Sequence, residues 1–537
     1  MRASLPALVL LSCASVAPSK PSVAPTTVTL PPSDAPPRAR ITHLLNRAAF
    51  GPSPADVEAV EKLGIEAWLT EQLQPGVDSA LEARLAAFPT LKLSVAQAFD
   101  QYPPPKKRLK EAGIAPDDTA AKKQLLASMK DELPRQLVLE LTQARLLRAL
   151  ESKRQLEEVL VDFWFNHFNV SAEKNRVKWM VTSYERDAIR PHVFGKFRDL
   201  LGATARHPAM LWYLDNWNSV RDGFETPAER RKRLSMADDE EDETPKMPRG
   251  LNENYARELL ELHTLGVDAG YTQNDVREAA RALTGWSVVA GPKQPDFGKF
   301  IFRWPAHDHG AKVIFGLKLP EGGGESDGDA LLDYLARHPA TAHHIALKLC
   351  QRFVSDDPPK ALVDRIAARF LETDGDLREV TRAIFESPEF WNSTDAKTKT
   401  PLEFVASSMR AVGTVHEVRP ILARTLEQMG QPLYRCTPPT GFAETSNAWI
   451  SAGALVARIN FGLALTSGRI PGVSVTLPPD ANVDVIAERV LGRPPSEKTR
   501  ETLMNALSAT EADGETRAVD PSKVAGLLLG SPEFQHQ

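Results

Sequence analysis

The densest group of residues able to do chemistry lies between residues 250 and 286, in the segment GLNENYARELLELHTLGVDAGYTQNDVREAARALTGW. The helix that this spacing predicts carries, on one side, the polar residues Asn254, Arg257, Glu258 and Glu261. Paired carboxylates can act as general acid and base or bind a metal ion, so Glu258 and Glu261 are the candidate catalytic residues. Asn254 and Arg257 would then bind the substrate. The alternative is a ladder of ion pairs, because Glu253, Arg257 and Glu261 follow at intervals of four residues.

The next helix adds a candidate residue for binding an anion. Thr272 and Asp275 have the spacing of a capping box, and Arg277 and Arg281 follow four residues apart. Guanidinium groups on one face could hold an anionic or hydroxyl-rich substrate, for which Arg281 is the candidate. They could equally neutralise the carboxylates of the preceding helix.

A second group that could do chemistry is the run His307-Asp308-His309 in a segment rich in Gly and Pro. Short alternating runs on either side predict a β-hairpin within residues 286–319, with this run at its tip. Imidazole and carboxylate together suit proton transfer or metal ligation near neutral pH, so His307 and Asp308 are candidate catalytic residues. Adjacent residues of a strand point to opposite faces, so at most two of the three can share a site. These residues indicate no particular metal or cofactor.

Other histidines have simpler explanations. His167 lies among the aromatic residues of FWFNHFNV, where a hydrogen-bonded core histidine is expected. His207 and His338 precede prolines and are expected to end helices. The sequence contains no GxSxG nucleophile elbow, no Walker loop, no HExxH motif and no dinucleotide fingerprint.

The elements that must position these residues are mainly helices. Ser53 can cap a helix, Pro54 suits its first turn and Gly64 interrupts it, which predicts helix, break, helix. Residues 134–170 predict one or two long helices. Further helices are expected near residues 329–336, 340–354, 360–372, 376–386, 401–413 and 451–467. The expected fold is therefore a mainly α, bundle-like body of many helices with a small inserted β-hairpin.

The composition is that of an ordinary folded protein. At 537 residues, of which 42% are hydrophobic and 25% charged, the chain should form two or three packed units. The net charge of −5, with both signs interspersed, argues against a dedicated nucleic-acid-binding protein. Three cysteines are too few for a disulfide framework or a Cys-rich zinc module.

The first residues resemble a bacterial export signal. MRASLPALVLLSC has one cation, a short apolar run and then a cysteine, and its last four residues resemble a lipobox in which Cys13 is lipidated. Cleavage without lipidation and a chance match remain open. The apolar run is too short to span a bilayer, so a membrane would be contacted only through the lipid.

We expect the chain to consist of four successive parts. These are the export signal at residues 1–13, a disordered Pro/Ser/Thr tether at 14–38, a helical body at 39–470 and a small helical unit at 471–537. Within the body, residues 221–249 form a charged segment with few core-grade side chains. It is expected to be a solvated loop, with a mobile lid as the alternative.

Several segments together resemble one bacterial family, known as domain of unknown function (DUF) 1800. They are HLLNRAAFGPSPADVE at 43, FWFNHFNV at 163, HPAMLWYLDN at 207, the segment from 252 to 286, HDHGAKVIFG at 307, HPATAHHIALKLCQRFV at 338, KTKTPLEFVASSMRA and GFAETSNAWISAGALVARINF. The resemblance implies export and partnership with an exported protein of the family known as domain of unknown function (DUF) 1501, but no substrate. It also implies that the loop at 221–249 is an insertion.

Two functions follow as hypotheses. The chain could be a non-catalytic scaffold of the cell envelope, periplasmic, lipid-anchored or secreted, in which the polar residues form structural ion pairs. It could instead be an extracytoplasmic hydrolase or another acid/base or metal-assisted enzyme. The second hypothesis requires the Glu258 helix and the His307 turn to face each other across a cleft.

Overall fold

The computed structural model describes residues 27–115, 117–225, 250–292, 294, 296–477, 482–508 and 520–537. The described chain is mainly helical with small two-stranded sheets, which confirms the expected fold class. Cys13, the first part of the predicted tether and most of the charged loop lie outside the described residues.

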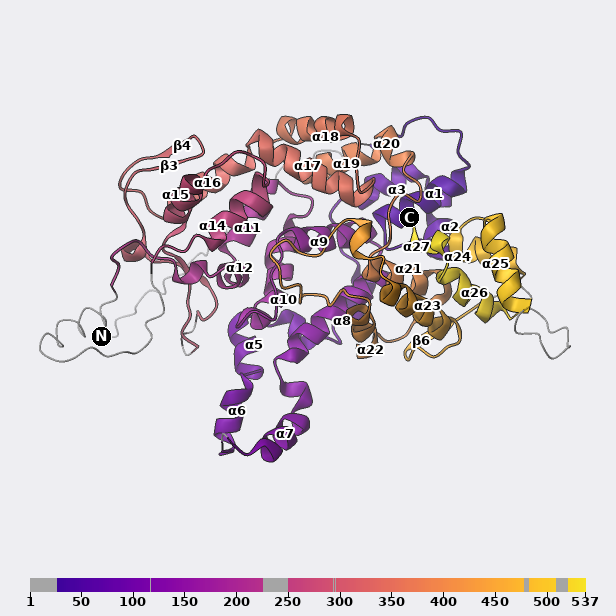
Figure 1. Cartoon of the computed structure of the whole chain (residues 1–537), viewed down its shortest axis with the longest axis horizontal. Helices are drawn as coiled ribbons and strands as arrows, with labels where there is room; N and C mark the ends of the chain where they lie inside the picture. Colours follow the sequence, from indigo (N-terminus) through magenta and orange to yellow (C-terminus); the bar gives the residue numbers. More distant parts are fainter. Residues whose placement is uncertain are drawn as a thin grey trace, which may run out of the picture.

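The N-terminal helices form as their capping residues predict. The Ser53 hydroxyl accepts a hydrogen bond from the Asp56 N–H, Pro54 begins helix α2, and Gly64, at φ +88°, separates it from α3. The elements of this part are α1 (Pro37–Ala48), α2 (Pro54–Leu63), α3 (Ile65–Gln72), α4 (Ser79–Leu85), α5 (Val95–Gln101), α6 (Pro105–Glu111) and α7 (Thr119–Ser128). Figure 1 shows α6 and α7 projecting from the body, and neither helix has a buried residue.

The chain before α1 is attached to the body. Val28 is 1% exposed, and its N–H donates to the Thr70 hydroxyl in α3 at 3.1 Å. The Thr29 N–H donates to the Glu386 carboxylate at 3.0 Å. Residues 27–36, the last part of the predicted tether, therefore contact helices far along the chain.

The central helices carry the aromatic run of FWFNHFNV. Its rings are buried because α9 lies within the core and not on its surface. The elements of this part are α8 (Arg135–Glu151), α9 (Gln155–His167), α10 (Val181–Ser183), the π-helix η4 (Tyr184–Ile189), α11 (Phe197–Arg206) and α12 (Pro208–Tyr213). Of the one or two long helices predicted for residues 134–170, the structure thus has two, α8 and α9.

The three small sheets are antiparallel pairs. The strands are β1 (Trp286–Val288) with β2 (Phe300–Phe302), β3 (Lys312–Ile314) with β4 (Leu317–Leu319), and β5 (Gly413–Val415) with β6 (Val473–Val475). Two hairpins therefore occupy the segment for which one was expected. The third sheet joins strands far apart in the sequence, which local patterns do not predict.

The remaining helices follow the predicted order. They are α14 (Asn254–Glu258), the π-helix η7 (Leu259–Thr264), α15 (Gln273–Leu283), α16 (Glu325–Ala336), α17 (Pro339–Phe353), α18 (Lys360–Glu372), α19 (Leu377–Phe385), α20 (Pro388–Trp391), α21 (Pro401–Val412), α22 (Pro420–Gln428), α23 (Ala452–Thr466), α24 (Val483–Leu491), α25 (Glu497–Ser508), α26 (Pro521–Leu529) and α27 (Pro532–Gln535). One apolar core runs from Val28 to Phe534, so the C-terminal helices share it. No described helix is both long enough and apolar enough to cross a membrane.

Candidate functional site

The acidic helix changes its pitch where the carboxylates lie. Helix α14 ends at Glu258 and continues as the π-helix η7, in which each turn holds more residues than an α-turn. Arg257 pairs with Glu253 at 3.3 Å, whereas the described residues include no ion pair between Arg257 and Glu261. The predicted ladder of ion pairs thus forms at its first step only, because the wider turn changes the angle between positions 257 and 261.

Glu258 and Glu261 lie among tyrosines. Burial raises the pKa of Glu258, and the neighbouring Glu261 carboxylate adds to the rise. Burial and Glu261 together raise the pKa of Tyr271 to about 12. The two carboxylates are therefore close enough to influence each other, which is how enzymes keep one member of a pair protonated.

The two predicted substrate-binding residues of this helix bind their own chain. The Asn254 side chain donates to the Leu214 carbonyl at 3.3 Å. The Arg257 guanidinium donates to the Gln273 side chain at 2.8 Å, at the start of α15. Both contacts hold the helix to its neighbours.

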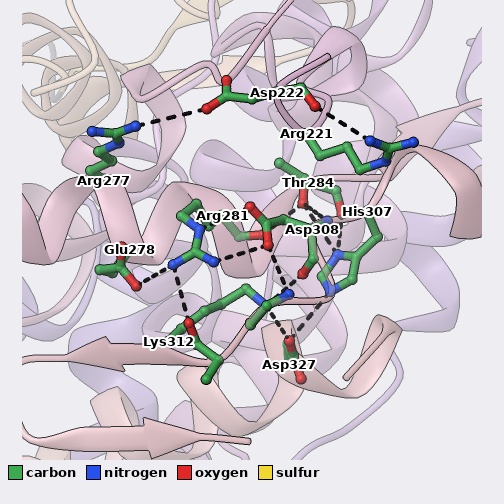
Figure 2. Close-up of polar contacts among 12 residues, drawn as sticks. Arg221, Asp222, Arg277, Glu278, Arg281, Thr284, His307, Asp308, Lys312 and Asp327 are labelled. Atoms are coloured by element: carbon green, nitrogen blue, oxygen red, sulfur yellow. Dashed lines mark hydrogen bonds and ion pairs between the residues drawn. The ribbon is translucent and has the colours of Figure 1, made fainter. Parts of the chain in front are cut away.

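His307 does not lie at a hairpin tip. After β2 ends, the short helix η8 (Trp304–Ala306) turns the chain inward, so that His307 lies between the two hairpins and is 0% exposed. Its Nδ1 donates to the Thr284 carbonyl at 2.8 Å, and its Nε2 lies 3.3 Å from Asp327 (Figure 2). Burial lowers the pKa of His307, which keeps the ring neutral near pH 7.

Asp308 is paired with Arg281 from the end of α15. The guanidinium donates to both carboxylate oxygens, at 2.9 and 3.0 Å, and also to Glu278 at 2.6 Å (Figure 2). This fork lowers the pKa of Asp308 to about 2. Arg281 was predicted either to bind a substrate or to neutralise carboxylates of the preceding helix. In the structure it pairs with carboxylates, but these belong to its own helix (Glu278) and to the His307 turn (Asp308).

Lys312 is a central residue of this group that sequence reasoning missed. It is fully buried, and its ammonium donates to the Asp308 carbonyl at 2.6 Å, the Gly310 carbonyl at 2.9 Å and the Asp327 carboxylate at 2.8 Å. A signal was present, because residues two apart on a strand share a face and Ile314 is an evident core residue. Figure 2 shows Lys312 and His307 converging on Asp327.

The two predicted groups contact opposite ends of α15. Arg257 binds Gln273 at its first residue, whereas Asp308 binds Arg281 near its last turn. Eight residues of helix separate these points by ~12 Å. Between the two groups the described residues make no hydrogen bond, ion pair or ring contact, so no direct contact supports a shared cleft.

A pocket of about 530 Å³, partly open to solvent, lies beside α9 and was not predicted. Four of the segments that resemble the family contribute residues to its lining, among them Asn166, Arg352, Thr400 and Glu444. Its central carboxylate, Asp162, accepts from Arg145 at 2.5 Å, and burial raises the Asp162 pKa. Asn166 in turn donates to Glu444 at 2.9 Å. The polar side chains of this pocket thus bind one another and hold the loop before α23 against α9.

Three imidazoles meet behind the acidic helix. The rings of His263 and His344 lie 6.3 and 6.1 Å from that of His167, and burial lowers the pKa of all three. His167 and His344 donate to backbone carbonyls of η7, so they are core residues, as expected for His167. Within the part of the chain that the structure describes, no group of three or more His, Cys, Asp or Glu side chains could hold a metal ion.

The remaining predicted residues are quickly placed. His207 and His338 each accept a hydrogen bond from the N–H two residues ahead, at 3.1 Å, and so cap the next helix through Nδ1. Cys350 and Cys436 are free and buried.

Comparisons with known proteins give one match. The family model described as "Protein of unknown function (DUF1800)" matches residues 43–536. No curated protein and no solved structure matches the chain.

Proposed function

Because the chain belongs to this family of unknown function, we propose a function from its own geometry: a helical scaffold of the cell envelope that binds another exported protein. The observation that carries the proposal is that His307 and Asp308, two of the four residues nominated for catalysis, are engaged internally. His307 is fully buried, and Asp308 is bound at both oxygens by Arg281. A general base must instead reach a substrate proton.

An apolar helix face offers a surface for the partner. On α23 Val456 and Ile459 are one turn apart and 57% and 37% exposed, and Ile450, just before the helix, is 50% exposed. Exposed apolar side chains that cluster on one face are typical of protein-binding sites. We therefore place the partner on this face of α23.

The resemblance to the family supports the choice of partner and the export of the chain, and the lipobox-like residues that end at Cys13 support a lipid there. The partner is an exported protein of the family known as domain of unknown function 1501, and the chain is exported with a lipid on Cys13. Labelling of cells with a radioactive fatty acid tests the lipid, since a Cys13→Ser variant should lose the label.

The test of the scaffold is co-purification with a co-expressed family 1501 protein. Val456→Glu and Ile459→Glu should abolish the complex, because each buries a charge in an apolar interface. Val313→Glu, on the exposed side of β3, is the matched control and should leave the complex intact. Loss of the complex in all three variants, or in none, would contradict the proposal.

A second candidate is acid/base catalysis at Glu258, independent of His307. It is favoured by the rise in the Glu258 pKa beside Glu261. If this candidate holds, Glu258→Gln should fail to restore the envelope phenotype of a deletion strain while its thermal stability and partner binding stay at wild-type levels. If Glu258→Gln restores the phenotype, only the scaffold remains.

A further inference from the structure

A second pocket, of about 560 Å³ and partly open to solvent, lies between α1, the segment before α21, and the C-terminal helices. Its lining includes His43 and Asn46 of α1, Lys399, Asp395, Arg493 and Phe534. Arg493 and Asp395 are paired with each other at 2.7 Å, but three other polar groups of the lining have no hydrogen-bond or ion-pair partner among the described residues.

Two of the unpartnered groups are hydrogen-bond acceptors. The His43 Nε2–H donates to the Phe390 carbonyl at 2.8 Å, so Nδ1 carries the lone pair. Burial lowers the pKa of His43 to about 4, which keeps this lone pair free near pH 7. Neither His43 Nδ1 nor Asn46 Oδ1 has a hydrogen-bond partner among the described residues, although both atoms are buried. Buried polar atoms are nearly always paired, so such a pair in one pocket indicates a ligand with donor groups.

The third unpartnered group is an amine. Lys399 is 2% exposed, and among the described residues its ammonium makes no hydrogen bond or ion pair and lies only over the Phe534 ring, 3.8 Å from the centroid. Lys397, two residues earlier, is similarly buried but donates to Asp356 at 2.5 Å. Burial lowers the pKa of Lys399 to about 7. The Glu403 and Asp395 carboxylates act in the opposite direction, whereas Arg458 lowers the pKa further.

We propose that this pocket binds a small hydroxyaldehyde or hydroxyketone, whose carbonyl carbon forms an imine with the Lys399 amine. The lysine nitrogen attacks the carbonyl carbon, and a proton moves from nitrogen to oxygen to give a carbinolamine. The proton that remains on the nitrogen then passes to the hydroxyl, the C–O bond breaks, the oxygen leaves as water and the C=N bond remains, with no change of oxidation state.

The partners of the ligand narrow its class. His43 Nδ1 and Asn46 Oδ1 accept hydrogen bonds, so the ligand must present donors, and hydroxyl groups beside a carbonyl do so. A phosphate or carboxylate would offer these two acceptors no donor, and the cation of the lining, Arg493, is already paired with Asp395 at 2.7 Å. A neutral hydroxycarbonyl compound satisfies both acceptors and is therefore favoured as the ligand.

The test is reductive trapping on the full chain with glycolaldehyde and sodium cyanoborohydride at pH 7, followed by peptide mass mapping. Lys399 should be modified at least ten-fold faster than Lys360, whose side chain is 82% exposed, because far more of the Lys399 amine is neutral. Lys397 should stay unmodified, since its ammonium is hydrogen-bonded. Modification of Lys399 no faster than that of Lys360 would overturn the proposal.

A second measurement tests the hydroxyl groups. Formaldehyde forms the same imine but has no neighbouring hydroxyl, so the ratio of the glycolaldehyde rate to the formaldehyde rate reports hydroxyl recognition. Asn46→Ala should lower this ratio several-fold at Lys399. An unchanged ratio would overturn the assignment of a hydroxyl-bearing ligand. Neither measurement depends on partner binding through α23, so their failure leaves the scaffold proposal standing.

Discussion

The substitution Lys312→Met tests whether the His307 turn is held by a buried ion pair. Lys312 and Asp327 are 0% and 5% exposed at their side chains, and their charged atoms are 2.8 Å apart. Methionine keeps the length of the side chain but leaves the Asp327 carboxylate buried without its cation. Removing one partner of a buried pair costs ~3–5 kcal/mol. We expect the free energy of unfolding at pH 8 to fall by about this amount.

The same substitution should make stability depend on pH. Among the described residues, the cationic partner that remains for Asp327 in Lys312→Met is a protonated His307, whose Nε2 lies 3.3 Å away. Burial and, to a smaller extent, repulsion by Lys312 lower the His307 pKa, so removing Lys312 should raise that pKa. A higher folded-state pKa adds stability at acid pH, and this gain is lost as the pH rises through that pKa. The loss relative to wild type should therefore be smaller at pH 5 than at pH 8, by ~1.4 kcal/mol per unit of pKa rise.

Urea unfolding at pH 5 and pH 8, followed by circular dichroism, measures both effects. Lys318→Met is the matched control, because Lys318 lies opposite Val313 in the same hairpin and is exposed. It should change stability by less than ~0.5 kcal/mol at either pH. A Lys312→Met protein as stable as the control, or one whose loss is the same at both pH values, would refute the reasoning.

Three further predictions concern other buried groups. Wild-type stability should fall between pH 6.5 and about 4, because the unfolded chain protonates histidines that the folded chain keeps neutral. At pH 5 each of these histidines contributes a loss of ~2 kcal/mol, measurable by thermal unfolding. The histidines concerned are His43, His263 and His344. Cys350 and Cys436, whose pKa values burial raises to about 12 and about 11, should react with a thiol reagent at least ten-fold more slowly in the folded than in the urea-unfolded chain, as read by mass mapping. Gly51→Ala should cost ~2 kcal/mol or more in urea unfolding, because Gly51 has φ +88° and an added Cβ would lie 2.4 Å from the Ser407 Cβ; an unchanged midpoint would contradict this.

Local signals predicted the helices well because those signals act within a few residues. The Thr272–Asp275 capping box begins α15 as expected, with both reciprocal hydrogen bonds present. The four residues SPEF occur twice, at 387–390 and 531–534, and both times they begin a helix in which the serine, Ser387 or Ser531, accepts a hydrogen bond from the N–H three residues ahead. Such contacts form inside one turn of helix, so the residues that make them are adjacent in the sequence.

The candidate site was less predictable because its partners come from distant segments. The Lys312–Asp327 pair joins a strand to a helix, and the Arg281–Asp308 pair joins a helix to a loop. The π-helix at residues 259–264 alters which side chains share a face, and no local residue signals it. The free His43 Nδ1 in the pocket of Lys399 is the result of a hydrogen bond from His43 Nε2 to the Phe390 carbonyl, which lies more than 340 residues away in the sequence.

The buried position of Val28 has a consequence for the distance between the protein and the membrane. If Cys13 carries a lipid as proposed, the chain runs only fifteen residue steps from Cys13 to Val28, the first described point attached to the body. At ~3.5 Å per residue they reach at most ~50 Å, against ~85 Å for a chain attached only from Pro37. A partner bound to such a lipid-anchored protein would thus be kept within a thin layer beside the bilayer.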